Sequence, residues 1–309
     1  MYESLKEHAR DFHLFIFAFD SLAYEILINS KLTNTSIISL EEFENQALLD
    51  IKGSRTRAEY CWTCTSSIIN YVFETFNVQS CTYLDADLYF YSSAEILLNE
   101  MPAGKSVLIT EHRFSKLARL FEKKRAGRFC VQFITFNNTK ESRSILNKWI
   151  GQCIDWCYAR YEDGKFGDQK YLESWPLEYP AVHILQNLGG GVAPWNVRQY
   201  DFIFKDDQIL GKDQKNNTGF EVIFFHFHFV RIMAEGIADL GWNWLPEDVI
   251  DGFYRPYIHK IVKKEQFLGT SFPEYKNLYG STSHHGIREI LKHIIKNVSG
   301  YNLIKLKGI

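Results

Sequence analysis

The sequence has no marked excess of charge of either sign. Its 309 residues include 35 Lys and Arg and 37 Asp and Glu, which gives a formal net charge of −2. A protein that binds nucleic acid carries clustered, excess Lys and Arg that neutralise phosphates. The nearly balanced charge provides no such footprint, and we therefore expect no nucleic-acid partner.

Long apolar runs and an export signal are also missing from the sequence. No run approaches the ~20 apolar residues that a helix needs to span a membrane. The amino terminus lacks the basic and then apolar pattern that is typical of a secretory signal. These absences predict a cytoplasmic protein with at most peripheral membrane contact.

Cysteine pairs of the kind that hold zinc are scarce. Cys61 and Cys64 form one Cys-x-x-Cys pair, but no second pair completes the ligands of a structural zinc site. Cys153 and Cys157 are four residues apart, which is the spacing of one helix face. Free cysteine behaves as a small hydrophobic residue. We therefore expect reduced thiols in the core.

Apolar and aromatic residues are plentiful, at 46% and 16% of the chain. This content provides a large core, and the length indicates one large domain with an extension. Apolar segments that read as strands alternate with segments of helical periodicity, which favours an α/β fold with a mostly parallel mixed sheet flanked by helices. The expected strands are 13–19, 35–40, 81–84, 106–110, 129–136, 182–185 and 221–229, and the expected helices are 21–30, 57–76, 143–161 and 286–296.

The most informative segment is Thr82–Phe90, in which Asp85 and Asp87 follow an apolar run. Residues i and i+2 of a strand point to the same side, so the two carboxylates converge on one small volume. Two ionised carboxylates repel each other unless a cation lies between them, and a divalent ion bound to a diphosphate is such a cation. The alternative is a solvated turn after a strand.

Two arginines, Arg55 and Arg57, precede the long helix that leads to this strand. Guanidinium groups match phosphate oxygens bidentately, although surface charge at a helix start is the plain alternative. Farther along, three consecutive glycines, 189–191, suit a close approach of the backbone to a ligand. Trp195 and Asn196 follow as a stacking platform and a hydroxyl partner for a sugar, or as an ordinary loop with a packed tryptophan.

Several segments taken in order resemble nucleotide-sugar glycosyltransferases of the GT-A fold, close to the glycogenin-like and bacterial lipopolysaccharide galactosyltransferase families. They are Arg55–Tyr60, Tyr83–Asp87, Phe166–Gln169, Gly189–Gly191 and His226–His228. The resemblance covers roughly residues 1 to 230, and the Tyr-Leu-Asp-Ala-Asp segment is its strongest match. It implies a nucleotide-sugar donor, with UDP as the expected nucleotide, a Mn²⁺ or Mg²⁺ cofactor, and a glycan or other acceptor of unknown identity.

The resemblance also implies roles for individual residues. Asp87 corresponds to the metal-binding carboxylate, and Asp85 to the one that contacts the donor ribose and shares the metal. His226 or His228 completes the metal shell; otherwise the two are hydrogen-bonded histidines of an aromatic strand.

Further implied roles concern donor binding and catalysis. Arg55, Arg57, Gly190, Trp195 and Asn196 fall in the donor-binding segments. Asp168 serves as a general base if the reaction inverts, and Gln169 lies at the reacting face of the sugar if it retains. From the residues alone, Asp168 is equally a helix N-cap.

The sequence departs from this family at its amino terminus. Residues 1–6 look like the helix that follows the usual first strand, and 13–19 like the second strand, so the first strand is expected to be absent. Such a loss would leave unpaired backbone groups in the sheet. The missing strand makes a degenerate nucleotide- or sugar-binding protein of the same fold a first alternative. A sugar-phosphate nucleotidyltransferase, which shares this sheet, is the second. The second usually opens with a glycine-rich phosphate loop, which this chain lacks.

The last part of the chain carries many aromatic residues. We expect a catalytic domain at 1–231 and an extension at 232–309 that packs on it and shapes the acceptor side, because so much aromatic surface is not left in water. The residues concerned are Trp242, Trp244, Phe253, Tyr254 and Tyr257. For the helix expected at 286–296, core packing is favoured over contact with a membrane surface.

Overall fold

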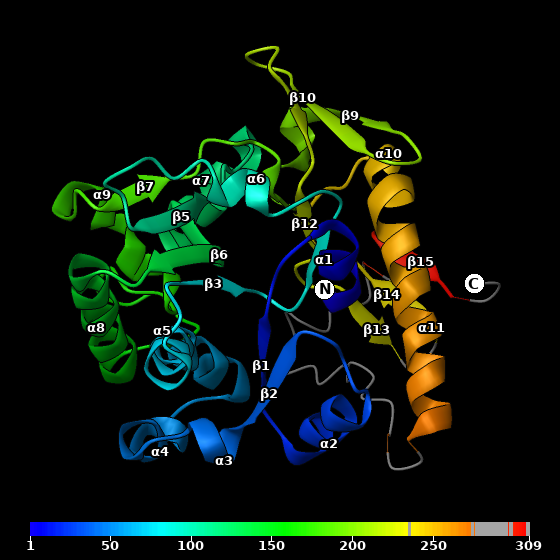
Figure 1. The fold of residues 1–309 in the computed structure, drawn as a ribbon. Coiled ribbons are helices and arrows are strands. Elements are labelled where there is room, and N and C mark those ends of the chain that lie inside the picture. Colours follow the sequence, from blue (N-terminus) through cyan, green and yellow to red (C-terminus); the bar gives the residue numbers. More distant parts are fainter. Residues whose placement is uncertain (234–235, 273–274, 276–295, 297–298, 307–309) are drawn as a thin grey trace.

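The computed structural model describes residues 1–233, 236–272, 275, 296 and 299–306. Its helices and strands alternate along much of the chain and build a mixed α/β fold with five small sheets among the described residues (Figure 1). The fold is therefore of the predicted α/β class. The expectation of a mostly parallel sheet is wrong, because only three of the strand pairs in the described part of the chain are parallel.

The largest sheet has the order β3-β6-β5-β7. It contains β3 (Ser80–Leu84), β6 (Phe129–Asn137), β5 (Val107–Glu111) and β7 (Val182–Ile184). β6 runs antiparallel to both of its neighbours. Every residue of β6 except Asn137 is buried, as its continuous apolar sequence predicts for a strand covered on both faces.

Two helices cover one face of this sheet, α5 (Arg57–Phe76) and α8 (Lys140–Asp155). The sequence predicts an inner helix stripe of Trp149, Cys153, Trp156 and Cys157. Trp149 and Cys153 are fully buried in α8, but the helix ends at Asp155, so Trp156 and Cys157 lie beyond it. α5 begins at a capping box in which Thr56 and Glu59 bond each other's backbone N–H groups. The opposite face of β5 and β6 packs against a second sheet through Leu108 and Phe133.

This second sheet carries the candidate site and has the order β4-β12-β8. It comprises β4 (Leu88–Phe90), β12 (Phe224–His226) and β8 (Gly190–Val192). β12 is antiparallel to β4 and parallel to β8. The register places His226 opposite Leu88. The strand expected over 221–229 is therefore shorter and ends at His226.

At the amino-terminal end, α1 (Tyr2–His8) precedes β1 (Leu14–Ala18), which pairs with β2 (Thr35–Ser39) across α2 (Ser21–Asn29). Among the described strands, β3 pairs only with β6 and β1 only with β2. No described strand lies between the β1–β2 sheet and the β3-β6-β5-β7 sheet.

An antiparallel sheet projects from the molecule (Figure 1) and was not predicted from the sequence; its strands are β9 (Tyr200–Phe204), β10 (Ile209–Asp213) and β11 (Gly219–Glu221). The remaining short helices connect the sheets. They are α3 (Leu40–Phe43), α4 (Gln46–Lys52), α6 (Glu95–Leu98), α7 (Lys116–Ala126), η1 (Gln169–Glu173), α9 (Trp175–Glu178) and η2 (Val197–Gln199).

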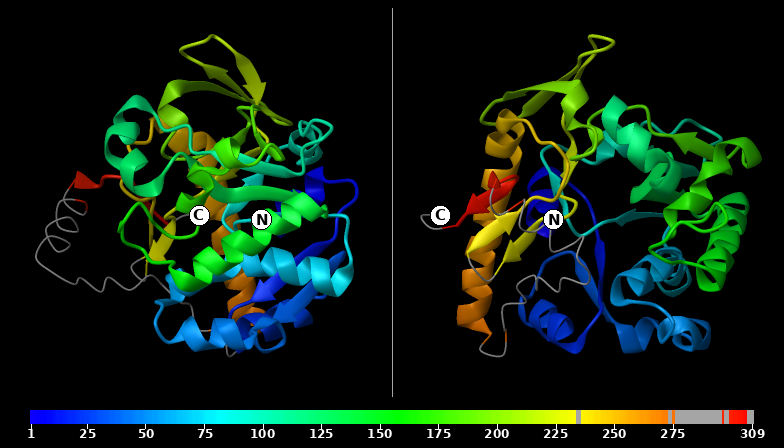
Figure 2. Two further views of the ribbon diagram at one scale, coloured as in Figure 1. Left: turned by 90° about the vertical axis from the view of Figure 1, so that its left-hand side faces the viewer. Right: turned by 180° about the vertical axis from the view of Figure 1, so that it is seen from behind.

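The described residues beyond 231 pack against the preceding part of the chain. Phe253, Tyr254 and Ile258 share one buried cluster with Phe225 and Phe227. Figure 2 shows α11 and the strands β13–β15 along the side of the molecule that lies away from α8. The elements are β13 (Arg231–Met233), β14 (Ile237–Asp239), α10 (Glu247–Val249), η3 (Ile250–Tyr254), α11 (Arg255–Ser271) and β15 (Leu303–Lys305).

Two predictions for this segment have different outcomes. The helix expected at 286–296 lies outside the described residues except for Lys296. Phe253 and Tyr254 are fully buried, but Trp242 and Trp244 are 50% and 59% exposed, so the expectation that all these aromatic residues are covered is wrong. No helix among the described residues is both long enough and apolar enough to cross a membrane.

Candidate functional site

The Asp-x-Asp segment connects the two central sheets. The backbone N–H of Asp85 donates to the carbonyl of Gln132 at 3.1 Å, which extends the β3–β6 pairing by one residue. The carbonyl of Asp87 accepts from the N–H of Phe227 at 3.0 Å, which extends the β4–β12 pairing. Both aspartates are therefore held at the carboxyl end of β3 and beside the carboxyl end of β12.

Side chains from these two segments form a compact cluster. Nε2 of His226 lies 3.0 Å from Oδ1 of Asp87 and 3.6 Å from Oδ2 of Asp85. Asp87, His226 and His228 each present one ligand atom, and these atoms lie within 4.8 Å of one another. The structure thus brings together the four residues that the sequence singled out, with the tightest grouping in Asp87 and the two histidines.

The charges in the cluster are coupled. Burial alone would raise the pKa of Asp87, but attraction to His226 holds it below its usual value. Burial also raises the pKa of Asp85, whereas burial of His226 is outweighed by Asp87 and Asp85, so the pKa of His226 is well above its usual value. The His226 side chain is therefore an imidazolium beside the two carboxylates when no metal is bound. Its positive charge offsets the repulsion between Asp85 and Asp87 that the sequence predicts.

His228 differs from its neighbour in charge. Burial and the nearby His226 lower the pKa of His228 to about 4, so this imidazole is neutral near pH 7. A neutral imidazole keeps a free lone pair, which is the form that binds a metal ion. Near pH 7, protons therefore compete with a metal ion at His226 but not at His228.

Trp195 forms a wall beside both histidines. Its ring centroid lies 5.3 Å from that of His226 and 5.5 Å from that of His228, each in an edge-on arrangement. Its indole N–H donates to the carbonyl of His112 at 2.8 Å, and only 7% of the residue is exposed. Trp195 therefore fixes the histidine rings and offers little open surface for stacking a sugar.

Asp168 interacts electrostatically with Asp85. It is buried, and burial together with the charge of Asp85 raises its pKa to about 7. The hydroxyl of Tyr83 donates to Oδ1 of Asp85 at 3.0 Å, and both Asp85 and Asp168 help to raise the pKa of Tyr83, after burial. Asp168 occupies the N-cap position of helix η1 but makes no side-chain capping hydrogen bond there. A raised pKa suits a proton-transferring group.

Gln169 is engaged elsewhere. Its side-chain amide donates to the carbonyl of Ala126 at 2.7 Å, at the last residue of α7. The residue therefore ties the end of α7 to η1, and this donor is not available to a sugar in the described conformation.

The two arginines are not brought to the carboxylates. Arg57 pairs with Asp20 at 2.6 Å on the surface, which explains its place in the first turn of α5. Arg55 donates to the carbonyl of Ile154 at 3.0 Å, and its guanidinium carbon lies 3.9 Å from the ring centroid of Tyr158. Arg57 is thus a surface charge at the start of a helix, and Arg55 anchors a loop.

Two further residues that were predicted to bind the donor, Gly190 and Asn196, are packed in the core. A Cβ atom on Gly190 would lie 2.6 Å from Leu185 and 2.8 Å from Leu97, so this glycine permits close packing of side chains. Asn196 has no exposed surface. Its amide donates to the carbonyls of His112 and Gly191, and its oxygen accepts from the N–H of Ala193.

Sequence reasoning missed Gln132. Its Oε1 accepts a hydrogen bond from Nδ1 of His226 at 2.5 Å. The residue is fully buried in β6. The signal was a single amide inside the apolar stretch 129–136, since a buried polar side chain requires a partner.

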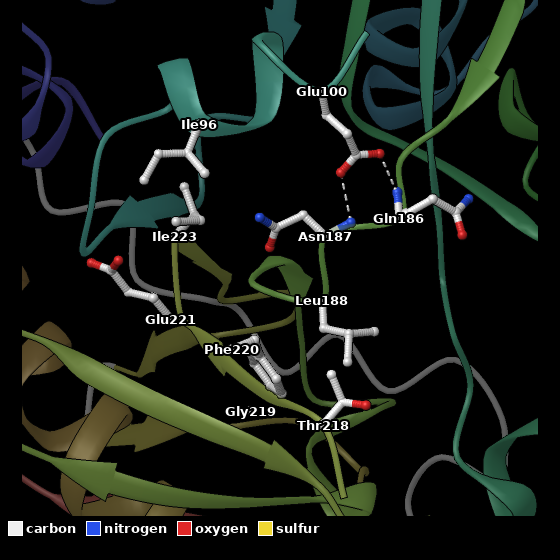
Figure 3. A pocket seen from close by; sticks show the side chains of 10 residues that line it. All are labelled: Ile96, Glu100, Gln186, Asn187, Leu188, Thr218, Gly219, Phe220, Glu221 and Ile223. Atoms are coloured by element: carbon white, nitrogen blue, oxygen red, sulfur yellow. Dashed lines mark hydrogen bonds between the residues drawn. The ribbon is translucent and has the colours of Figure 1, made fainter. Parts of the chain in front are cut away.

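The structure also contains a pocket of about 490 Å³, shown in Figure 3. It lies at the amino-terminal ends of β8 and β12, whereas His226 is the last residue of β12. The carboxylate of Glu100 points at one wall, where it accepts from the N–H groups of Gln186 at 2.5 Å and Asn187 at 2.7 Å. This carboxylate stabilises a loop, and the pocket is separate from the metal-ligand cluster.

Comparisons with known proteins identify relatives. No family model matches the chain. The uncharacterized protein YfnD of Bacillus subtilis (strain 168) is 30% identical over 280 residues, which are 89% of this chain and 88% of YfnD. The chain belongs to the same family as YfnD. The uncharacterized protein YfnF of that organism is 29% identical over 76% of this chain and 77% of its own length.

A solved structure also matches: a glycosyltransferase involved in glycosylation of the major capsid of PBCV-1. The match has a TM-score of 0.40 and 11% sequence identity, and it covers 71% of this chain and 94% of the other. A likeness at this level carries no argument about function.

Proposed function

We propose that the protein is a metal-dependent glycosyltransferase that moves a sugar from a nucleotide diphosphate donor, with UDP as the expected nucleotide, to a glycan or other acceptor. The observation that carries the proposal is the convergence of Asp87, His226 and His228 within 4.8 Å at the end of the Asp-x-Asp strand. The resemblance of the sequence motifs supplies the reaction class.

The donor set fits a divalent metal ion. One carboxylate oxygen and two imidazole nitrogens suit Mn²⁺, and Mg²⁺ is the alternative when oxygen ligands dominate. His226 is already oriented by Gln132, with its Nε2 toward Asp87 at 3.0 Å. A bound ion would neutralise the charge of the leaving diphosphate.

Asp85 and Asp168 would act directly on the substrate, and Trp195 would support the metal site. Asp85 is partly exposed and is held in place by Tyr83, so it suits a contact with the donor ribose. Asp168 is the candidate for holding or moving a proton, because its pKa is about 7. Trp195 keeps the histidine rings in place.

The experiment that tests this proposal combines binding and turnover. Thermal melting would be measured with and without Mn²⁺ in the presence of UDP, GDP, CDP and TDP, followed by release of sugar from the matching nucleotide sugars. We expect one nucleotide to raise the melting temperature only with Mn²⁺, and the sugar donor to be hydrolysed slowly. No nucleotide response with metal present would contradict the proposal.

The degenerate binding protein is the second candidate, and a specific observation favours it. Arg55, Arg57, Gln169 and Asn196 all make contacts within the protein, so fewer groups are left for the donor. Metal-dependent nucleotide binding with no hydrolysis or transfer over a day would favour this candidate over the transferase.

A further inference from the structure

The buried amide of Gln132 contacts the ring nitrogen of His226 that faces away from Asp87. Oε1 of Gln132 lies 2.5 Å from Nδ1 of His226, while Nε2 of the same ring lies 3.0 Å from Asp87. The two ring nitrogens therefore have separate partners on opposite sides.

We propose that Gln132 is a positioning residue that fixes the tautomer of His226, so that Nδ1 carries the proton and Nε2 is presented to the metal ion. The inference rests on the proposed function, because it deepens the same site. A histidine that binds a metal is usually oriented by a hydrogen bond from its other nitrogen, and this partner tunes metal affinity.

Two observations on Gln132 support a role beyond packing. First, its Nε2 is buried and has no hydrogen-bond partner among the described residues. An unsatisfied buried amide group destabilises a fold, so an apolar side chain would stabilise β6 more than this glutamine does. The glutamine is therefore poorly explained by stability alone.

Second, the missing side chain of Gly191 makes room for the amide of Gln132. A Cβ on Gly191 would lie 3.0 Å from Nε2 of Gln132, and Gly191 has a φ of +105°, a conformation that favours glycine. Gly191 thus leaves room for the amide, which holds Oε1 toward His226. Gly191 is one of the three consecutive glycines, and it is the one that provides space for this side chain.

The test compares three variants by calorimetric titration with Mn²⁺. Gln132→Met removes the acceptor and keeps most of the volume, and we expect it to bind Mn²⁺ 10- to 100-fold more weakly, in the range of such orienting contacts. Gln132→Glu keeps an acceptor oxygen and should restore most of the affinity. Thr135→Val removes a buried hydroxyl of the same strand, bonded to Thr82 at 2.9 Å, and should leave Mn²⁺ affinity unchanged.

A second measurement requires no folded variant at position 132. Two-bond ¹⁵N–¹H correlation spectra of the wild-type protein loaded with Zn²⁺, a diamagnetic probe, report which nitrogen of each histidine is protonated; His226→Gln assigns the signal. We expect the proton on Nδ1 and the metal on Nε2.

The outcomes separate the inference from the proposed function. Unchanged Mn²⁺ affinity in folded Gln132→Met, or a proton on Nε2 in the Zn²⁺ spectrum, would overturn the inference while the metal site stands. Wild-type protein that binds neither Mn²⁺ nor Zn²⁺ would overturn both. Metal binding with the expected tautomer but no response to nucleotide would overturn the transferase alone.

Discussion

The carbonyl of Asp87 accepts a hydrogen bond from the backbone N–H of Phe227 at 3.0 Å. These residues are 140 positions apart in the chain, and the bond locks the Asp-x-Asp loop to the residue that separates the two histidines. The candidate site is therefore assembled by pairing of β4 with β12. The aspartates and the histidines lie next to each other only when both central sheets are formed.

Replacing Asp87 should remove the metal response without unfolding the protein. With ligand at 100 times Kd, binding to the native state adds about 2.7 kcal/mol to stability, and Asp87→Asn should lose this gain. Relief of the repulsion between Asp85 and Asp87 would by itself raise the melting temperature. Because His226 lies 3.0 Å away as its partner, the substitution should instead lower the melting temperature without metal.

Thermal melting with and without Mn²⁺ and nucleotide checks this expectation. Asp207→Asn, at an exposed position, is the matched control and should respond as wild type does. Asp85→Ala should weaken donor binding less completely if its main partner is the ribose. An Asp87→Asn protein that responds to metal as strongly as wild type would show that the Asp-x-Asp segment is a structural turn.

The buried carboxyl of Asp168 should make stability depend on pH. Its pKa is raised to about 7 in the folded state by burial and by Asp85, against 3.8 ordinarily. A group with a raised folded pKa stabilises the fold fully below pH 4, and this contribution is lost as pH rises through 7. Relative to Asp168→Asn, the metal-free wild type should therefore lose up to about 4 kcal/mol between pH 4 and pH 8.

Urea unfolding in EDTA at a series of pH values measures this difference. Asp207→Asn should show no comparable trend, because Asp207 is exposed. Parallel pH profiles for wild type and Asp168→Asn would mean that the pKa of Asp168 is not raised in the folded protein.

Aromatic residues beyond 231 should differ sharply in their contribution to stability. Phe253 is fully buried against Phe225, so Phe253→Ala should lower the free energy of unfolding by about 3–5 kcal/mol. Trp244 is 59% exposed and carries the guanidinium of Arg198 over its ring, so Trp244→Ala should cost about 1 kcal/mol or less. Chemical denaturation of the two variants side by side decides the matter. Equal losses would contradict the packing described for this segment.

Gly190 should matter for packing and not for donor binding. A Cβ at this position meets the ends of Leu97 and Leu185, so Gly190→Ala should destabilise the protein by about 1–3 kcal/mol through overpacking. The affinity for a nucleotide, measured by calorimetry on the folded fraction at low temperature, should stay within twofold of wild type. A selective loss of affinity at unchanged stability would return Gly190 to the donor site.

The sequence by itself determined the local parts of this protein. The apolar run of 129–136 predicts a strand covered on both faces, and β6 is one. The spacing of Trp149 and Cys153 predicts the buried stripe of α8, and the paired aspartates predict a strand end with two convergent carboxylates. These features depend on periods of 2 and 3.6 residues, which are properties of the chain over short distances.

Only the tertiary structure decided partners and directions. Whether β6 runs parallel or antiparallel to β3 depends on long-range strand pairing, for which a local sequence pattern carries no signal. In the structure β6 is antiparallel to both of its neighbours. The same holds for side chains that suit two roles. Arg57 meets Asp20, Asn196 meets backbone carbonyls, and Gln132 meets His226, each because the fold places one partner within hydrogen-bond distance and excludes the others.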